Sequence, residues 1–289
     1  MSEYPQRIVC LTEETTETLY LLGEDWRIVG VSGYTVRPPE ARKKPRVSAF
    51  TTARFDAIME LQPDLVLTFS DLQADITAEL VRRGLNVFNF NQRSLEEILA
   101  MMATLARLVG AHERGAALLA AMRSGLDAVA ASAARFRFRP RVLFEEWKDP
   151  LITGIRWVEE LVSLAGGDPV FPELGHEPCA RQRIVAPAAV VARDPEVIIA
   201  SWCGQKVNKR ALAARPGWDA IAAVRAGHIY EIKSTYILQP GPAALTEGVR
   251  QLHAILAHVA DAQPDPALAP EQRVDPDLLR GRAPQVGAP

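Results

Sequence analysis

The sequence predicts an α/β protein made of two Rossmann-like lobes with parallel sheets, joined by a long rigid α-helix, with a ligand cleft between the lobes. Three observations lead to this fold class. The two halves of the 289-residue chain carry a similar pattern in the same order. Short apolar segments alternate with helical patterns, which is typical of parallel sheets with crossover helices. A central stretch, residues 94–134, has almost no turn signals.

The internal repeat is visible in three pairs of segments, found in the same order and at nearly the same offset. In the first pair, each member has a short amphipathic helix, a proline followed by an acid, and a buried strand. Repetition of this kind indicates two similar lobes. The pairs are FDAIMELQPDLVLTFS (55–70) with APAAVVARDPEVIIASW (186–202), RIVCL (7–11) with RVLFE (141–145), and TTETLYLLG (15–23) with WVEELVSLAGG (157–167).

The first lobe is predicted over residues 1–93. Its strands are short apolar runs, as expected for strands that are buried on both faces of a sheet. Helical patterns separate them, so the sheet is expected to be parallel. The predicted strands are Ile8–Leu11, Arg27–Val31, Leu65–Phe69 and Asn86–Phe90.

The linking segment, residues 94–134, predicts two helices. Ser94 and Glu97 have the spacing of a capping box and open the first helix. That helix pauses at Gly110, and a second helix rich in alanine and leucine runs from about His112 to Ala134. We therefore expect a stiff helical connection between the lobes.

The second lobe is predicted over residues 135–262. A final helix begins after the turn QPGP, where Pro242 suits a first-turn position, and reaches about Ala260. The tail, residues 263–289, is rich in proline and alanine and is expected to be mostly disordered or to wrap the surface. The predicted strands of this lobe are Val142–Glu145, Val197–Ser201 and His228–Ile232.

Bulk properties exclude several classes of protein. A net charge of −2 gives no electrostatic reason to expect nucleic acid or an anionic membrane as a partner. The chain has only three cysteines, so a disulfide framework is not expected. It has no run of 18 apolar residues, so no membrane span is predicted. The first residues lack the pattern of a secretory signal, so a cytoplasmic location is expected for the chain as written. A periplasmic location is the alternative, if an export signal precedes this sequence.

The predicted strands end in aromatic and small polar residues. In open parallel sheets, ligands bind beyond the carboxyl ends of the strands. Aromatic residues at these positions therefore predict a shared aromatic cleft for a large, flat, partly apolar ligand, with Ser32, Thr35, Ser70, Asn91 and Ser201 at its periphery. The alternative is that each aromatic is a core residue that caps its own sheet. The aromatics at strand ends are Tyr34, Phe69, Trp147, Trp202 and Tyr236, and Trp157 follows the loop KDPLITGIR.

The segment HEPC places His176 and Cys179 three residues apart, with Cys203 after a neighbouring strand. Histidine and thiolates can bind zinc, or one of them can fill an axial site of a chelated metal. The alternatives are a plain loop histidine and two buried thiols. Because only one short pair exists, no resident metal is predicted, but His176 and Cys179 stay candidates for contact with a ligand.

Signatures of catalysis and of nucleotide binding are absent from the sequence. No GxGxxG follows the first strand, and neither GxxxxGK[ST] nor GxSxG occurs. Glu13 and Glu14 are possible general bases, but acids are common where a helix starts because they complement its dipole. We therefore predict no catalytic residues, no intrinsic cofactor and no enzyme activity.

At this point the sequence resembles a known family. RIVCLTEETTETLYLLGEDWRIVGVSGY, LQPDLVLTF, the linking helix, AGGD and the late GP resemble the cobalamin and iron-siderophore substrate-binding proteins of ABC importers, over about residues 5–260. FEEWKDPLITGIRWVEELVSLAGG and SWCG are most similar to the cobalamin-binding branch. The resemblance implies a two-lobe clamp that holds a corrinoid without catalysis, works as a monomer and docks on a transporter permease. It implies that Trp147, Trp157 and Trp202 pack on the corrin ring, while Thr12, Glu13, Arg156 and Gln205 reach rim amides or phosphate.

Two other functions stay open. The same cleft suits another metal chelate, such as a siderophore or haem. It also suits a chelatase or a relative of the metallocluster-assembly enzymes, which share two-lobed α/β architectures. A binding protein takes up one coloured ligand stoichiometrically and releases it unchanged, whereas a chelatase turns over a metal and a macrocycle.

Overall fold

The computed structural model describes residues 3–263 and 265–270, and the chain folds into two compact units. Unit 1 comprises Met1–Arg123 with Gln239–Ala243, and unit 2 comprises Ser124–Leu238 with Ala244–Pro289. The mixed α/β class with parallel-rich sheets is confirmed. The division differs from the predicted lobes, because the unit boundary falls inside the long helix and residues 239–243 belong with unit 1. Most of the predicted tail, residues 271–289 and 264, lies outside the described residues.

Unit 1 contains a six-stranded sheet with the strand order β4-β3-β2-β1-β5-β6. All pairs are parallel except the one formed by β4. The four predicted strands are confirmed to within a few residues, and β3 and β4 are additional. Neither could be predicted, because β3 has only four residues, of which two are arginine and serine, and β4 has only two. The strands are β1 (Ile8–Cys10), β2 (Ile28–Ser32), β3 (Arg46–Ala49), β4 (Thr52–Ala53), β5 (Leu65–Phe69) and β6 (Val87–Phe90).

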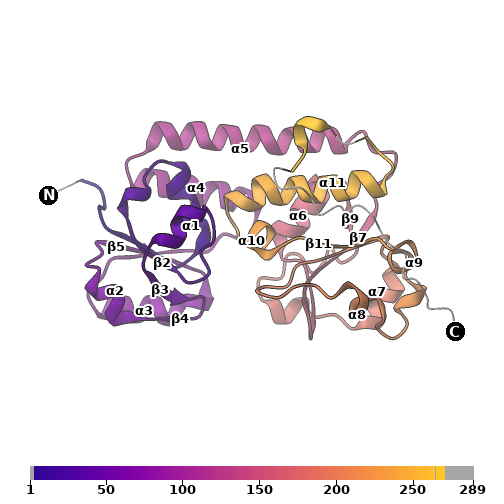
Figure 1. The fold of residues 1–289 in the computed structure, drawn as a ribbon, viewed down its shortest axis with the longest axis horizontal. Coiled ribbons are helices and arrows are strands. Elements are labelled where there is room, and N and C mark those ends of the chain that lie inside the picture. The colour runs from indigo at the N-terminus through magenta and orange to yellow at the C-terminus, as the bar shows by residue number, and fades with distance from the viewer. Residues whose placement is uncertain (1–2, 264, 271–289) are drawn as a thin grey trace. The chain divides into compact units, whose positions relative to one another are not determined.

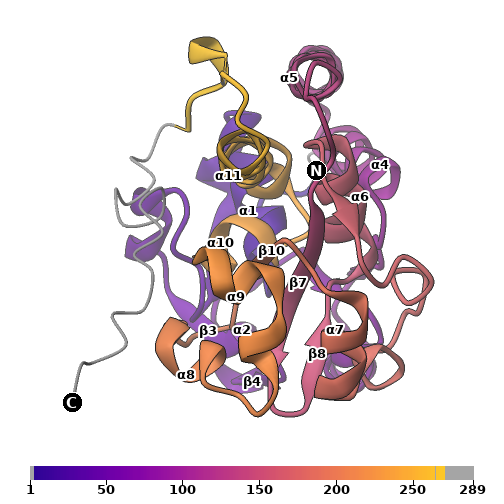
Figure 2. The ribbon, with the colours of Figure 1, turned by 90° about the vertical axis from the view of Figure 1, so that its right-hand side faces the viewer.

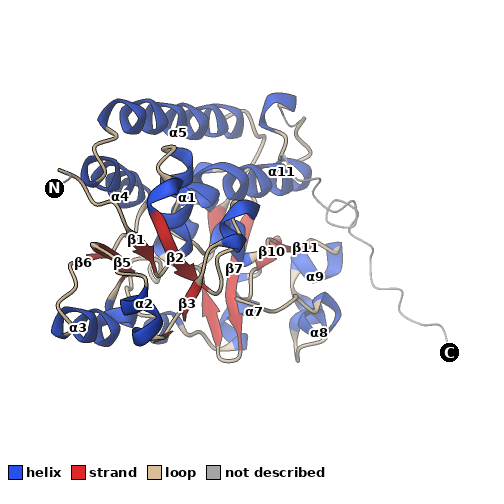
Figure 3. Cartoon of the chain, turned by 60° about the vertical axis from the view of Figure 1, so that its left-hand side comes forward, coloured by secondary structure: helices blue, strands red, loops and turns tan. Residues whose placement is uncertain are grey.

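Helices cover both faces of the unit 1 sheet (Figure 3). Helices α1 (Glu13–Leu21) and α4 (Leu95–Leu108) pack against each other on one face. Helices α2 (Phe55–Glu60) and α3 (Ala74–Arg82) cover the other face. The capping box of α4 is confirmed, since Ser94 Oγ accepts from the Glu97 N–H at 3.2 Å and Glu97 reaches back to the Ser94 N–H. The apolar core on the α2–α3 side is formed by Val9, Leu11, Val47, Ile58, Val66, Ile76 and Leu80.

Unit 2 contains a five-stranded sheet built on β7, with the order β11-β10-β7-β8 and β9 also paired to β7. Helices α6 and α11 lie on one face of this sheet, and α7, α8 and α9 lie on the other (Figure 2). The strands are β7 (Arg141–Lys148), β8 (Leu151–Thr153), β9 (Asp168–Pro169), β10 (Val197–Ala200) and β11 (Ile229–Glu231). The helices are α6 (Arg156–Leu164), α7 (Pro187–Arg193), α8 (Lys209–Ala213), α9 (Ala222–Ala226), α10 (Ser234–Ile237) and α11 (Val249–Val259).

The last helix opens with a π-helical turn, Ala244–Gly248, before it becomes α11. This start after QPGP agrees with the sequence. A side chain at Gly248 would meet the backbone carbonyl of Tyr236, so glycine is required where α10 and this turn meet.

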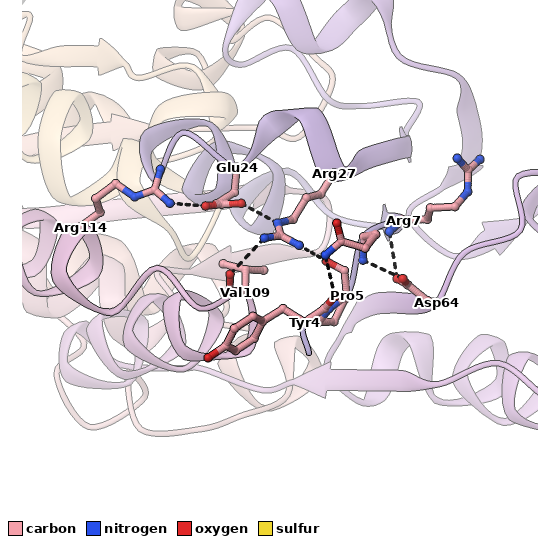
Figure 4. Close-up of polar contacts among 9 residues, drawn as sticks. Tyr4, Pro5, Arg7, Glu24, Arg27, Asp64, Val109 and Arg114 are labelled. Atoms are coloured by element: carbon pink, nitrogen blue, oxygen red, sulfur yellow. Dashed lines mark hydrogen bonds and ion pairs between the residues drawn. The ribbon is translucent and has the colours of Figure 1, made fainter. Parts of the chain in front are cut away.

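The long helix α5 (His112–Ala133) agrees with the predicted bounds (Figure 1). Its first half is tied into unit 1 by two ion pairs: Arg114 donates to Glu24, and Arg123 makes two hydrogen bonds with Glu96 at 2.7 and 3.0 Å. Glu24 also binds Arg27, which holds the carbonyls of Pro5 and Val109 (Figure 4).

By length and composition alone, α5 is also apolar enough to cross a membrane, although the sequence has no continuous apolar run of that length. Helices of soluble proteins meet the same criterion, so the finding is weak evidence for a span.

The internal repeat includes a shared backbone conformation and hydrogen-bond pattern at the proline that precedes a central strand of each unit. In unit 1 this proline precedes β5. Gln62 adopts a left-handed conformation, with φ 48°, directly before Pro63. Asp64 then accepts hydrogen bonds from the backbone N–H groups of Gln6 and Arg7 at 2.7 and 3.0 Å (Figure 4). The Arg7 side chain donates to the Gln62 carbonyl at 3.2 Å. These bonds fix the start of β1 against the start of β5.

Unit 2 repeats this arrangement before β10. Asp194 is left-handed, with φ 43°, and precedes Pro195. Glu196 accepts from the Arg141 N–H at 2.9 Å, and the Arg141 side chain donates to the Asp194 carbonyl at 2.7 Å. The recurring Pro-acid pair and the recurring arginine therefore form the same joint between two parallel strands in each unit.

Replacement of Asp64 by alanine is expected to lower the free energy of unfolding by about 1–2 kcal/mol, because two backbone N–H groups lose a charged acceptor. Urea denaturation followed by circular dichroism measures the change. Asp56→Ala is the matched control, since Asp56 is 93% exposed and forms only a surface ion pair with Arg83. Its cost is expected to stay below about 0.5 kcal/mol, and equal costs at both positions would contradict the proposed role of the joint.

Candidate functional site

Unit 1 places the ends of its parallel strands along one edge of its sheet. Thr12 and Tyr34 lie two residues beyond β1 and β2, and Phe69 is the last residue of β5. Their predicted positions at strand ends are therefore confirmed. Contact between these side chains and a ligand stays a prediction, as does the cleft between the lobes, because each unit is described by itself.

Four buried polar atoms without a hydrogen-bond partner lie along this edge of unit 1. Each belongs to a residue at or shortly after the carboxyl end of a different strand: β1, β2, β3 and β6. Buried polar atoms normally have partners, so such exceptions mark positions where a ligand's polar groups can bind. The sequence named Thr35 among them as a peripheral polar residue and Glu14 as a possible general base, but neither Ser48 nor Gln92. The four atoms are Glu14 Oε1, Thr35 Oγ1, Ser48 Oγ and Gln92 Oε1.

Two adjacent glutamates open α1 at this edge. Burial raises the pKa of Glu13 to about 7. Burial, followed by repulsion from Glu13, raises the pKa of Glu14 to about 8. Thr15 and Thr16 direct their hydroxyls to the Thr12 carbonyl at 3.3 and 3.1 Å rather than to these acids. Near neutral pH the two carboxyls therefore carry much less than two full charges and can donate as well as accept hydrogen bonds.

Of the two aromatics that the sequence analysis named at the ends of unit 1 strands, only Tyr34 is open to solvent, with 54% of its surface exposed. Phe69 is 5% exposed, and the Arg93 guanidinium lies over its ring at 5.2 Å while pairing with Asp71 at 2.9 Å. Tyr34 is thus the better candidate for stacking against a ligand.

In unit 2, the strand ends are organised by a buried carboxylate, Glu145 on β7. Arg215 donates to it at 2.5 and 2.9 Å, and the Trp202 indole N–H donates at 3.0 Å. Trp202 is 5% exposed and belongs to the apolar core of the unit. The indole thus packs in the core and satisfies Glu145, which agrees with the alternative of a core residue that caps its sheet. Contact of Trp202 with a ligand stays a prediction.

Trp157 and Tyr236 are also buried. The Trp157 indole N–H donates to the Ile237 carbonyl at 3.0 Å, which joins α6 to α10. Tyr236 lies in α10, at 8% exposure. Both have structural roles within unit 2, and their contact with a ligand stays a prediction.

Trp147 and Arg156 are half-buried. Trp147 packs beside the core and donates to the Asp149 carbonyl at 3.0 Å, inside the turn from β7 to β8. Arg156 is paired with Glu160 at 2.8 Å, one turn further along α6. Trp147 thus keeps part of its ring open, whereas the charge of Arg156 is already partnered.

The residues proposed as metal contacts lie on loops. His176, Cys179 and Cys203 are exposed, so the alternative of two buried thiols is wrong. Gln205, which the resemblance assigned to rim amides or phosphate, is also exposed. Within residues 3–263 and 265–270, no group of three or more histidine, cysteine or acidic residues could hold a metal ion. A closed zinc site therefore finds no ligand set in the described part of the chain.

The sequence missed a second polar network in unit 2. Arg183, 1% exposed, donates to Glu146 at 2.6 Å and to the Thr153 carbonyl. Burial raises the pKa of nearby Glu159 to about 8, although the charge of Arg183 opposes this shift. Glu159 fits only because residue 154 is glycine, whose missing side chain leaves room for the carboxyl. An arginine in a loop carries no sequence signal of burial, so this network could not be predicted.

Three exposed lysines lie at the strand ends of unit 2, and the sequence analysis assigned none of them a role in the site. Lys148 ends β7, Lys206 lies in the loop after β10, and Lys233 lies two residues beyond β11. Lys148 also lies over the Trp202 ring at 5.1 Å. The carboxyl edge of the unit 2 sheet therefore offers positive charge, whereas that of unit 1 offers largely neutral polar groups.

Two α/β units with polar and aromatic side chains at the carboxyl edges of parallel sheets define a ligand-binding protein of two similar units. The chain belongs to the periplasmic binding protein family, which matches residues 8–236.

Three similar proteins illustrate the range of the family. The cobalamin-binding protein of Halobacterium salinarum is 25% identical over 257 residues, which cover 86% of this chain and 69% of that protein. The uncharacterized ABC transporter substrate-binding lipoprotein YvrC of Bacillus subtilis is 25% identical over 262 residues, 86% of this chain and 79% of that one. The crystal structure of a periplasmic haem-binding protein from Pseudomonas aeruginosa shares the fold, with a TM-score of 0.77 at 20% identity, over 90% of this chain and 95% of that chain. The family and these relatives are binding proteins.

Proposed function

We propose that this protein binds a corrinoid of the cobalamin type, releases it unchanged and delivers it to an ABC importer. The observation that carries the proposal is the set of unpartnered buried atoms along the carboxyl edge of unit 1. Three of the four, on Thr35, Ser48 and Gln92, belong to neutral groups, which suit the amide-fringed rim of a corrin. The similarity to a cobalamin-binding protein supports the same ligand class.

The lysines of unit 2 support cobalamin over cobinamide. Cobalamin carries one phosphodiester in its nucleotide loop, and cobinamide lacks it. Lys148, Lys206 and Lys233 follow three neighbouring strands and can bind such an anion. Arg156, which the resemblance assigned to the rim or the phosphate, is a weaker candidate because Glu160 already binds it.

Titration of the protein with cyanocobalamin, cobinamide and haemin, followed by calorimetry and the visible spectrum, tests the proposal. Saturable 1:1 binding of cyanocobalamin is expected. Tyr34→Ala is expected to weaken it by about tenfold, through loss of one stacking contact. Lys206→Gln is expected to lower the affinity for cyanocobalamin about tenfold and to leave the affinity for cobinamide almost unchanged, because only cyanocobalamin carries the phosphate.

Lys43→Gln provides a matched control, since Lys43 is an exposed lysine of unit 1 outside the strand-end loops. Its affinity is expected to equal that of the wild type. Absence of heat and of a spectral change with both corrinoids would overturn the corrinoid proposal. Binding of haemin alone would assign the site to another metal chelate, the coarser function that the relatives support.

Enzyme activity as a chelatase is the second candidate from a different class, and the same samples distinguish it. A binding protein returns the chelate with its metal in place, whereas a chelatase releases metal or inserts it. Direct ligation of cobalt by His176 or Cys179 is a further part of the proposal, because both side chains are exposed on one loop. If either residue ligates cobalt, the visible spectrum changes when the corrinoid binds, and His176→Ala or Cys179→Ala abolishes that change.

The location follows from the same relatives. One is a lipoprotein that belongs to an ABC transporter, and another is periplasmic. They favour a site of action outside the cytoplasm over the cytoplasmic location expected from the sequence as written. An ABC transporter permease is accordingly the proposed partner, and a monomer is the proposed state.

A further inference from the structure

The segment between α5 and β7 alternates arginine and phenylalanine, in the sequence Arg135-Phe-Arg-Phe-Arg139. It follows the end of α5 and lies beside the end of α11 (Figure 1). Among the large apolar residues exposed in the described chain, Phe138 is the only one with an arginine on each side, and 47% of its surface is exposed. Neither the fold nor the proposed ligand site uses it.

Two anchors hold this segment in place. Phe136 stacks on the buried His253, with ring centroids 5.2 Å apart, and His253 Nε2 bonds Ser132 Oγ at 3.0 Å. Arg139 binds Asp168 and the Gly167 carbonyl, both at 2.7 Å. The residue between these anchors, Phe138, is thereby held at the surface.

The other two arginines are available. The Arg137 side chain makes no hydrogen bond or ion pair with another residue of the described chain, and the Arg135 guanidinium makes only a long bond of 3.4 Å to the Ser132 hydroxyl. Both line a pocket of about 250 Å³, together with Ser132, Phe136, Asp261, Ala262 and Gln263. Asp261 is the single acid among these lining residues, so arginine charge predominates.

We propose that Arg135, Arg137 and Phe138, here called the Arg-Phe surface, dock this protein on an anionic phospholipid membrane. Guanidinium groups bind lipid phosphates by paired hydrogen bonds, and an exposed phenylalanine gains by entering the interface between headgroups and acyl chains. An anionic leaflet attracts each such cation, and the attraction falls off within a Debye length.

Charge complementarity favours lipid over another protein as the occupant. Arg135 and Arg137, whose side chains form no ion pair with another described residue, precede Phe138, while Arg139 on its other side binds Asp168. Two unpaired cations beside a single apolar anchor match the phosphate layer above an apolar layer. The Arg-Phe surface has one large apolar side chain, Phe138, because the neighbouring Phe136 is stacked on His253. It therefore lacks an apolar face of the size that a protein partner would cover. The proposal does not depend on the identity of the ligand.

Flotation of the whole protein with vesicles tests the proposal, comparing phosphatidylcholine vesicles with vesicles that also contain phosphatidylglycerol. Binding is expected only to the anionic vesicles and is expected to weaken as salt is raised. The double variant Arg135→Gln/Arg137→Gln is expected to bind about thirtyfold more weakly, since each basic residue near such a surface strengthens binding about fivefold. Phe138→Ser is expected to bind about tenfold more weakly.

The matched control is Val81→Ser/Arg82→Gln in unit 1, an exposed apolar residue beside an exposed arginine. It is expected to bind as the wild type does. Equal binding to both kinds of vesicle, no binding to either, or unchanged binding by the Phe138 and arginine variants would overturn the proposal. Self-association that Phe138→Ser abolishes, without vesicle binding, would instead assign the surface to a second copy of the chain.

Discussion

Replacement of Glu145 by alanine is expected to lower the free energy of unfolding by about 3–5 kcal/mol, the cost of breaking a buried ion pair by removing one partner. Glu145 is fully buried and accepts three hydrogen bonds, two from Arg215 and one from Trp202. The variant leaves the Trp202 indole N–H without its acceptor in the core of unit 2, and the half-buried Arg215 guanidinium without its acidic partner. Denaturation by urea, followed by tryptophan fluorescence, measures the loss.

Glu79→Ala is the matched control for Glu145. Glu79 also binds an arginine, Arg83, at 2.8 Å, but on the surface of α3. Its loss is expected to cost far less than the loss of Glu145, because exposed ion pairs contribute little to stability. If the Glu145→Ala protein does not fold, Glu145→Gln keeps the shape and one acceptor and is expected to cost less than the alanine variant but more than the control. Similar values for the Glu145 and Glu79 variants would contradict the structural role assigned to Glu145.

Replacement of Glu14 by glutamine is expected to make the protein increasingly more stable than the wild type as the pH rises. Burial raises the pKa of Glu14 from 4.5 to about 8, so the folded state holds the proton more tightly than the unfolded state. The stabilisation from this proton is fully present below pH 4.5 and is lost as the pH rises toward 8. Glutamine stays neutral throughout and avoids the loss, so a gain on the order of 2–4 kcal/mol is expected at pH 8.

Unfolding by urea at a series of pH values between 4.5 and 8 measures this difference. Glu96→Gln is the control, because Glu96 is exposed and Arg123 lowers the pKa of its carboxyl. No gain with rising pH is expected for that variant. A constant difference between the Glu14→Gln protein and the wild type over this range would show that Glu14 ionises as freely in the folded state as in the unfolded one.

The strands, the long helix and the repeat could be predicted because their signals are local. Apolar runs such as Leu65–Phe69 need burial on both faces, and the capping box of Ser94 is complete within four residues. The short strands β3 and β4 could not be predicted, because pairing with a neighbouring strand, not apolar content, creates them. The unit boundary inside α5 was not predicted either, and the ion pairs that tie the first half of α5 to unit 1 join it to Glu24 and Glu96, which are distant in sequence.

The sequence by itself determined which loops carry the candidate site, because strand order in a parallel sheet places those loops along one edge. The sequence could not show which side chains at that edge are exposed and which are buried with a hydrogen-bond partner inside the protein. Trp157 and Trp202 resemble Trp147 in the sequence, yet both are buried, with their indole N–H groups bound to Ile237 and Glu145. Only the tertiary structure decides this, because burial and hydrogen-bond partners depend on residues up to 80 positions away. For the same reason, the unpartnered atoms of Ser48 and Gln92 and the buried cation of Arg183 became visible only in the folded chain.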